Sequence, residues 1–240
     1  MIALVDERLG AAEERALMLG GATVIRLPRS RYLSEAVCSH PDMLLFYNRG
    51  HIITSADWFE ESPWALTDVY ELVRGIRITC TGEIHGRDYP YDAIFNALVL
   101  GEYIFYKEDT VSEAIKKHAA KNGLKPVPVK QGYPACTSLA FGRSMITADE
   151  GMADAARRVG IKVTLIENGD ILLPPYEYGF IGGAAGVYRD NVYFIGNIER
   201  HRDFRRIDEA IRAEGYTPVS LSDGPLRDLG RIIFIDERVN

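Results

Sequence analysis

One arrangement recurs five times along the chain: an amphipathic helical stretch, a glycine, and then a short strand rich in β-branched residues. In one of these stretches the apolar residues Phe204, Ile207 and Ile211 recur at three- and four-residue spacing, which predicts a helix with one buried face. A glycine just past a helix supplies the left-handed residue that ends it. The five glycines are Gly21, Gly75, Gly123, Gly160 and Gly215. Such periodicity predicts a fold built from copies of one supersecondary unit.

A pair of strands joined by a short turn precedes four of the predicted helices. The pairs are 43–47 with 51–54, 93–100 with 102–106, 137–141 with 144–147, and 179–187 with 191–195. The fifth pair is split between the chain ends, and we expect strand 231–235 to pair with strand 2–5, which removes two exposed edges. The predicted fold is therefore an α/β protein, a five-fold pseudo-symmetric α/β propeller of β-β-α-β repeats, closed by pairing of the N- and C-terminal strands.

The same periodicity bears on domain organisation. A length of 240 residues allows one large domain or two small ones. Because the repeat runs from end to end, we expect a single domain over residues 1–240. Its approximate repeats are 42–91, 92–135, 136–177 and 178–227, with the split repeat formed by 228–240 and 1–41.

Composition and charge exclude several classes of protein. Hydrophobic residues make up 47% of the chain, which is too many for a disordered protein, and no stretch approaches the ~20 apolar residues of a membrane span. The net charge of −6 indicates no nucleic-acid partner. The three cysteines, Cys38, Cys80 and Cys136, are too few and odd in number for a disulfide framework, which favours the cytoplasm. The oligomeric state stays open, and a homo-oligomer is compatible with the sequence.

In each repeat, the loop after the strand that follows the helix carries a proline and then a chemically reactive side chain. Equivalent positions in a five-fold propeller point at the same axial region. We therefore expect four carboxylates and one thiol around a central cavity: Asp42, Asp92, Cys136, Glu177 and Asp228. The alternative interpretation is that these residues cap strand ends, with Cys136 a small buried apolar residue, because repeats also duplicate turn chemistry.

A ring of carboxylates has consequences for its ligand. Neighbouring carboxylates raise one another's pKa unless a cation lies among them, and a planar guanidinium pairs with carboxylates in two-pronged hydrogen bonds. Carboxylates alone also disfavour the Cys136 thiolate, whereas a bound guanidinium reverses that effect. These residues therefore predict a small cationic ligand, with a guanidino compound as the best match.

Five β-β-α-β units with a split closing pair resemble the pentein fold of the guanidino-group-modifying enzymes, such as arginine deiminase, agmatine deiminase and dimethylarginine dimethylaminohydrolase. In those enzymes a cysteine attacks the guanidinium carbon, a histidine acts as general acid/base, and acidic residues hold the guanidinium. The phrase Pro90-Tyr91-Asp92 is similar to the family's His-x-Asp motif, with proline where the histidine belongs. The resemblance thus implies that Asp92 anchors the guanidinium.

The resemblance leaves two positions for the nucleophile. Cys136 lies in a phrase similar to the family's nucleophile turn, whereas chain order puts Asp228 at the nucleophile's place in the split unit. With Cys136 as nucleophile, the active site is rotated around the pseudo-symmetric ring. With Asp228 there, the hydrolase chemistry is lost or altered.

Four further polar residues are candidates. His85 and His40 could replace the missing acid/base, or be ordinary loop histidines. Asn48 and Asn96 lie within predicted inner strands, and each is either a ligand contact or a buried amide that needs a partner. The histidines, with Cys38, Asp42 and Glu83 near them, show no paired zinc pattern, so neither a metal nor another cofactor is predicted.

The sequence therefore predicts an atypical pentein-like protein that binds a guanidino or related cationic small molecule. If it is an enzyme, it is similar to the amidinohydrolases and amidinotransferases. It then uses Cys136 as nucleophile, Asp92 as anchor and His85 or His40 as acid/base, supported by Asp42, Asp228 and Glu177. The competing hypothesis is a non-catalytic pentein with a degenerate active site that acts as a binding or interaction module.

Overall fold

Each of the five predicted glycines follows a helix and has a positive φ, as at Gly21 with a φ of 84°. Side chains cap three of the α-helices in these segments: Ser55 accepts a hydrogen bond from the Trp58 N–H, Ser112 from the Ala114 N–H, and Asp149 from the Met152 N–H. The prediction that a helix ends at each glycine is therefore confirmed. The helices are α1 (Ala11–Leu19), α3 (Ala56–Glu61) continuing through η1 (Pro63–Leu66) into α4 (Thr67–Leu72), α5 (Glu113–Lys121), α7 (Glu150–Arg158), and α8 (Phe204–Ala213) preceded by η2 (Ile198–Arg200).

The computed structural model describes residues 1–237, and its strands form small mixed sheets. In five of them, an antiparallel pair is followed by a parallel strand reached across one of the helical segments. These sheets are β17-β1-β2 (Ile233–Ile235, Ile2–Asp6, Thr23–Leu27), β3-β4-β5 (Leu45–Asn48, His51–Ser55, Arg77–Thr81), β6-β7-β8 (Leu98–Leu100, Tyr103–Tyr106, Lys125–Pro128), β9-β10-β11 (Ser138–Phe141, Ser144–Thr147, Lys162–Leu165) and β13-β14-β15 (Ala185–Tyr188, Asn191–Phe194, Thr217–Ser220). Strands β12 (Ile171–Leu172) and β16 (Leu226–Arg227) form a short parallel pair.

The predicted pairing of the first and last strands is present. Strand β1 pairs antiparallel with β17, with Ile2 opposite Ile235, and the N-terminal amine lies 2.9 Å from the Glu237 carboxylate. The mixed α/β class is thus confirmed. The five sheets nevertheless remain separate ladders, and no continuous closed sheet forms among residues 1–237.

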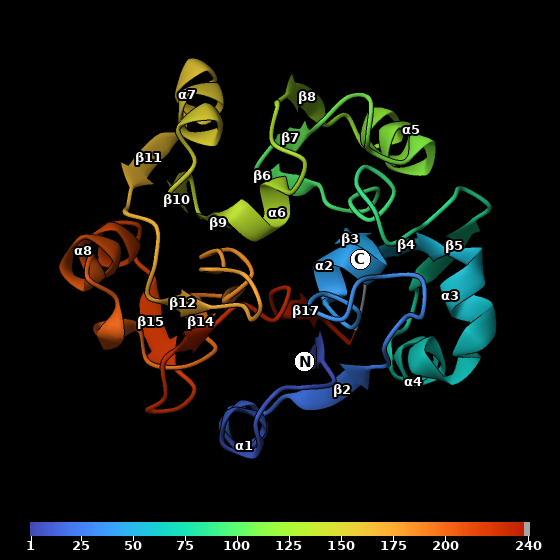
Figure 1. Ribbon diagram of the computed structural model, residues 1–240, viewed down its shortest axis with the longest axis horizontal. Helices are drawn as coiled ribbons and strands as arrows, with labels where there is room; N and C mark the ends of the chain where they lie inside the picture. The colour runs from blue at the N-terminus through green and yellow to red at the C-terminus, as the bar shows by residue number, and fades with distance from the viewer. Residues whose placement is uncertain (238–240) are drawn as a thin grey trace.

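The middle strand of each sheet holds the apolar core. In β1 and β10 every residue is buried, although alternate side chains point to opposite faces. Figure 1 shows the reason: helices surround the molecule on the outside, and the neighbouring sheets lie around its centre. Helices cover one face of each sheet and the adjacent sheets cover the other. No helix within the described part of the chain is long and apolar enough to cross a membrane.

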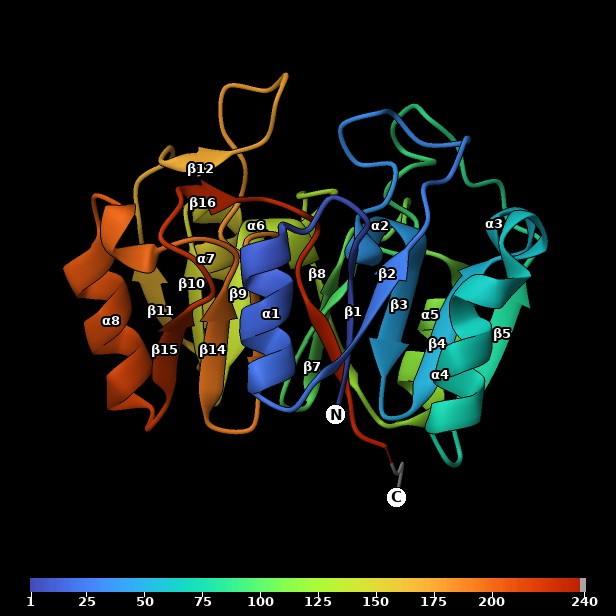
Figure 2. The same ribbon diagram turned by 90° about the horizontal axis from the view of Figure 1, so that it is seen from below.

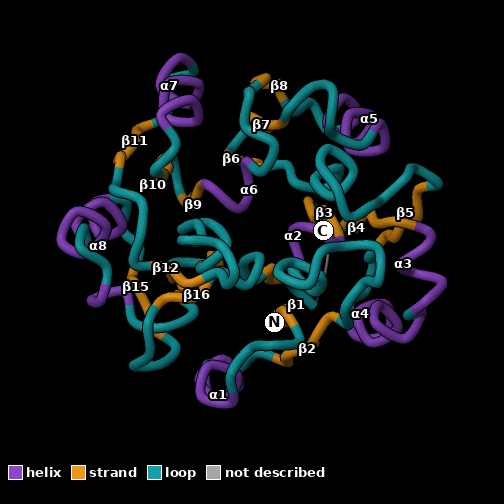
Figure 3. Tube along the Cα trace, in the orientation of Figure 1, coloured by secondary structure: helices purple, strands orange, loops and turns teal. Residues whose placement is uncertain are grey.

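Tight turns precede the first strand of several sheets, where the sequence predicted longer strands. Residues 93–97 and 179–184 are turns or irregular, and strands β6 and β13 begin only at Leu98 and Ala185. One-turn helices α2 (Pro41–Leu44) and α6 (Pro134–Thr137) precede β3 and β9, each with proline in its first turn, where the missing N–H costs nothing. In Figure 3 these short helices and the loops near them lie toward the centre of the view.

Long loops gather on one face of the molecule. Figure 2 shows the segments between β2 and α2, between β5 and β6, and between β12 and β13 extending beyond the same ends of the sheets. These segments contain or adjoin most of the predicted site residues, so the fold brings together side chains that are far apart in the sequence.

Candidate functional site

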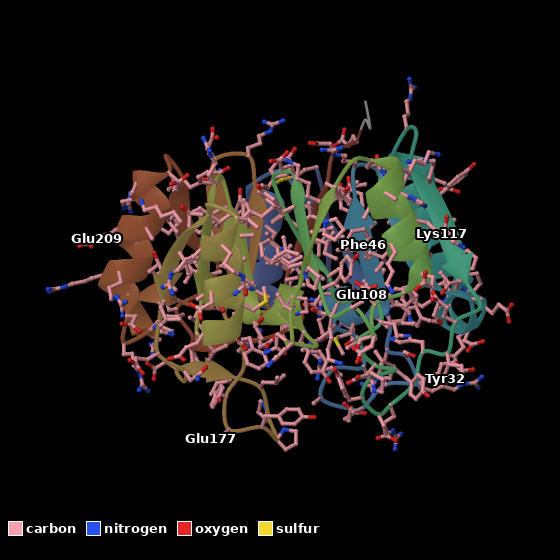
Figure 4. The ribbon with its side chains drawn as sticks, turned by 90° about the horizontal axis from the view of Figure 1, so that it is seen from above. Tyr32, Phe46, Glu108, Lys117, Glu177 and Glu209 are labelled. Atoms are coloured by element: carbon pink, nitrogen blue, oxygen red, sulfur yellow. The ribbon has the colours of Figure 1, made fainter. Side chains whose placement is uncertain are left out.

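A cavity of about 420 Å³ opens among these loops. Five predicted site residues line it: His40, Asp92, Cys136, Glu177 and Asp228. The rest of its wall is mainly apolar or aromatic, from Val37, Met43, Tyr133, Leu173, Tyr176, Tyr178 and Phe180, with Ser34. Glu177 is exposed, and Figure 4 shows it on the loop that projects from this face, so it belongs to the mouth of the cavity.

Cys136 lies at the inner end of the cavity within a buried hydrogen-bond network. Its thiol donates to Asp42 Oδ2 at 2.9 Å, and the Asn96 side-chain amide donates to the sulfur at 3.1 Å. The Asn96 Oδ1 in turn accepts from the Ala135 N–H at 2.8 Å. Burial raises the pKa of the Cys136 thiol well above its usual range, and the Asp42 and Asp228 carboxylates raise it further. The thiol is therefore protonated at neutral pH in the absence of a ligand.

Asp228 is buried in a cradle of backbone. Its Oδ2 accepts from the Phe180 N–H at 2.9 Å and its Oδ1 from the Gly230 N–H at 3.1 Å. Burial, followed by the negative charge of Asp42, raises the pKa of Asp228 to about 7. A Cβ at Gly183 would lie 1.9 Å from Asp228 Oδ1, so the glycine is needed for this close approach.

Asp92 lies nearer the aromatic side of the cavity. The Tyr133 hydroxyl donates to Asp92 Oδ2 at 2.8 Å, and the Asp92 Oδ1 has no hydrogen-bond partner among the described residues. Burial raises the pKa of Asp92, and the hydrogen bond from Tyr133 opposes this shift. Tyr133 was not predicted from the sequence as a site residue, because it directly precedes the loop proline Pro134, whereas the ring of candidate acids and thiol was taken from residues that follow each proline.

The two candidate histidines are both buried, but only His40 lines the cavity. Its Nδ1 lies 4.0 Å from Asp228 Oδ1 and its Nε2 lies 3.8 Å from Asp6 Oδ2. His85 instead packs edge-on against Phe95, with ring centroids 5.2 Å apart. Burial lowers the pKa of His40 to about 3 and that of His85 to about 4, so both rings are neutral at physiological pH.

A second, smaller cavity of about 210 Å³ lies among the first strands of several sheets. Asp42 and Asn48 line it, so these two predicted residues do not face the larger cavity. Asn48 Oδ1 lies 3.0 Å from His118 Nε2, which gives this amide a partner within the protein.

Arg231 also lines the second cavity, and the sequence did not single it out. It has a φ of 63°, and its buried Nε has no hydrogen-bond partner among the described residues. Its guanidinium acts on Asp42, where it opposes the increase in pKa caused by burial. The only signal in the sequence was a cation three residues after Asp228, at the start of an otherwise apolar strand.

The site as a whole is a layer of ionisable groups between two cavities. Asp228, Asp92 and Cys136 face the larger cavity, Arg231 faces the smaller one, and Asp42 connects them through its contact with the thiol. Within residues 1–237 no group of three or more histidine, cysteine or acidic side chains is arranged to hold a metal ion. The arrangement can hold a small cation beside a protonated thiol.

Solved structures similar to this chain share its fold. An amidinotransferase of the saxitoxin biosynthetic pathway from Microseira wollei matches with a TM-score of 0.57 at 11% identity, over 93% of this chain and 78% of that chain. Dimethylarginine dimethylaminohydrolase from Pseudomonas aeruginosa, as a cysteine-to-serine variant with citrulline, gives 0.55 at 13% identity, over 92% of each chain. Inosamine-phosphate amidinotransferase from Streptomyces griseus gives 0.56 at 18% identity, over 93% and 78%. The chain therefore has the pentein fold of the guanidino-group-modifying enzymes.

Within that fold, the chain belongs to a family of unknown function, DUF6873, whose profile matches residues 4–233. No curated protein matches the sequence.

Proposed function

We propose that this chain binds a guanidino or related cationic small molecule in the larger cavity. The observation that carries the proposal is that Asp92, Glu177 and Asp228, from three separate loops, line one cavity beside Cys136. Similar solved structures include two amidinotransferases and a hydrolase of dimethylarginine, which supports the same ligand class here. The proposed framework is a single domain over residues 1–240, arranged as a five-fold propeller of β-β-α-β repeats.

Charge and shape both favour a planar cation. Asp228 is buried, and a cation beside it would compensate the charge that burial disfavours. A guanidinium can donate two parallel hydrogen bonds to such a carboxylate. The aromatic residues Tyr133, Tyr178 and Phe180 line the same cavity. A cation over the face of such a ring gains about 0.5–1 kcal/mol at an exposed site and about 2 kcal/mol when it is desolvated.

Catalysis at Cys136 is the further part of the proposal. A guanidinium next to the sulfur would favour the thiolate, and Asp42 Oδ2, 2.9 Å away, is placed to accept the thiol proton. The thiolate would then attack the guanidinium carbon and form a C–S bond, and one C–N bond of the guanidinium would break as the leaving amine takes up the proton held by Asp42. Water, for hydrolysis, or an acceptor amine, for transfer, would then displace the sulfur from the amidino carbon and return the thiol. His40 is the candidate acid/base because it lines the cavity, whereas His85 lies outside the lining.

The second candidate function is a non-catalytic binding or interaction module with the same fold. Two observations favour it: the pKa of the Cys136 thiol is raised well above its usual range, and Asp228 stands where chain order puts the family's nucleophile. Both functions share the acidic cavity and differ only in whether the thiol reacts.

A thiol-reactive amidine separates the two. Chloroacetamidine should form an adduct on Cys136 with a rate that saturates with probe concentration, because the amidinium binds beside the acids before the sulfur reacts. Mass spectrometry locates the adduct. The matched controls are the free cysteines Cys38, which is buried, and Cys80, which is exposed. Cys136→Ser should remove the saturable reaction and leave any slow labelling of Cys80. If Cys136 is no more reactive than Cys38, the assignment of Cys136 as nucleophile fails and the non-catalytic binding or interaction module remains.

We also propose that the protein acts in the cytoplasm and that its partners include neither nucleic acid nor a membrane. All three cysteines are free, which supports a reducing compartment.

A further inference from the structure

The charges around the larger cavity all have the same sign. Three carboxyl groups line it, from Asp92, Glu177 and Asp228, and none of the described residues in its wall is a lysine or arginine. Arg8 and Arg231 act on buried carboxyl groups of this region, but neither lines the larger cavity. Arg8 donates to Asp6 at 2.6 Å and to the Ala36 carbonyl at 2.9 Å, and Arg231 lines the second cavity.

We propose that this cavity selects cations that carry no carboxylate: guanidines with an uncharged or positively charged tail, and not amino acids. This inference rests on the proposed function and narrows its substrate class. A carboxylate entering the cavity would lose hydration and meet three acidic groups without a cationic partner. Burying an unpaired charge in this way is costly.

The remainder of the wall indicates the body of such a ligand. Val37, Met43, Leu173 and Phe180 would contact an apolar chain or ring placed between the inner and outer acids. Asp228 is buried at the inner end, whereas Glu177 is exposed at the mouth. A guanidinium at the inner end, an apolar spacer, and a neutral or cationic group at the mouth would therefore match the wall along its length.

Four guanidines whose guanidino group carries a chain of three or four methylene or methyl carbons test this selectivity by isothermal titration calorimetry at pH 8: 1-butylguanidine, 4-guanidinobutylamine, 4-guanidinobutyrate and arginine. We expect the first two to bind, with 4-guanidinobutylamine the tighter because its amine meets Glu177. The two carboxylate-bearing probes should bind at least about tenfold more weakly than 1-butylguanidine, which corresponds to about 1.4 kcal/mol of binding free energy.

A single added cation should then reverse the preference. Tyr176 lines the mouth and is 56% exposed, so Tyr176→Arg can place a guanidinium there without disturbing the core. This variant should bind 4-guanidinobutyrate about tenfold more tightly than the unmodified protein does. Tyr70→Arg, at a 68% exposed position on α4 outside the cavity lining, is the matched control and should leave all four affinities unchanged.

The outcomes distinguish this inference from the proposed function. Arginine or 4-guanidinobutyrate binding as tightly as 1-butylguanidine would overturn the selectivity and leave guanidino binding intact. A Tyr176→Arg variant with no gain for 4-guanidinobutyrate would show that the missing cation is not the cause of the preference. If none of the four probes binds, the proposed function fails and the selectivity fails with it.

Discussion

Asp228→Asn should make the ligand-free protein more stable at pH 8 and less stable at pH 4. The pKa of Asp228 is about 7 in the folded protein, against an ordinary value of 3.8. Because the folded state holds this proton more tightly than the unfolded state does, the stability that Asp228 contributes falls as the pH rises from about 4 to 7. The difference between these two pKa values corresponds to about 4 kcal/mol of folding stability lost by pH 8, which asparagine would restore because it carries no charge.

Part of that gain is offset. Asparagine has one acceptor oxygen for the two N–H groups of Phe180 and Gly230, and the loss of one hydrogen bond costs about 1–2 kcal/mol. We therefore expect a net stabilisation of about 2 kcal/mol at pH 8. At pH 4 the Asp228 carboxyl of the unmodified protein is already protonated, so asparagine restores no stability there. Only the cost of the lost hydrogen bond remains, and the variant is less stable. Asp6, His40, Asp42 and Cys136 are the other ionisable groups around Asp228, and they are unchanged in the variant.

Urea unfolding at the two pH values measures both effects, and Asp223→Asn, at an exposed position, is the matched control. Cation binding supplies an independent readout. In the unmodified protein the affinity for 1-butylguanidine should increase as the pH rises through 7, because the ionised form of Asp228 binds the cation. In Asp228→Asn the binding should be weak and should lose this pH dependence. A variant with equal stability change at pH 4 and pH 8 would contradict the assignment of a raised pKa to Asp228.

Arg231→Met should destabilise the protein by about 3 kcal/mol at neutral pH, because it removes the guanidinium whose positive charge acts on the buried Asp42 carboxyl. Methionine keeps most of the apolar length of the side chain. It also keeps a side chain at a φ of 63°, where glycine would relieve backbone strain and obscure the result.

The double variant Arg231→Met with Asp42→Asn identifies the cause. If the loss comes from uncompensated charge, adding Asp42→Asn should recover about half of it, since both members of the interaction are then neutral. Urea unfolding measures all three variants, with Arg205→Met on the exposed face of α8 as control. Strictly additive effects of the two substitutions would show that Arg231 does not stabilise Asp42.

The strand pairing could be predicted from the sequence because its signals are local. Glycines such as Gly21 and Gly160 end helices through their own backbone preference, and short turns join the strand pairs. The irregular segments 93–97 and 179–184 could not be predicted, because a continuous apolar run is compatible with a buried strand or a buried turn. Gly182 is required by the close approach of the Ala135, Ser138 and Cys136 carbonyls, and Gly183 by that of the Asp228 side chain, and these groups are distant from both glycines in the sequence.

Part of the candidate site could also be predicted, because it follows the repeat. Residues in phase with the repeated proline loops, such as Asp92, Cys136 and Asp228, do line one cavity. Groups that break the repeat could not be found in this way. Arg231 interacts with Asp42 only through the folded arrangement. His85 was a candidate from its place in the sequence, but it packs against Phe95 instead of lining the cavity.

The split sheet has a consequence for the order of folding. Strand β1 can complete its sheet only when β17 is available, and Asp228 and Arg231 lie in the segment that leads into β17. During synthesis, the other four sheets can form before this segment leaves the ribosome. Pairing Ile2 with Ile235 is a contact of very high sequence separation, which makes it slow to form. The proposed ligand site therefore stays incomplete until this late segment docks, so the proposed ligand would stabilise only molecules that have finished folding.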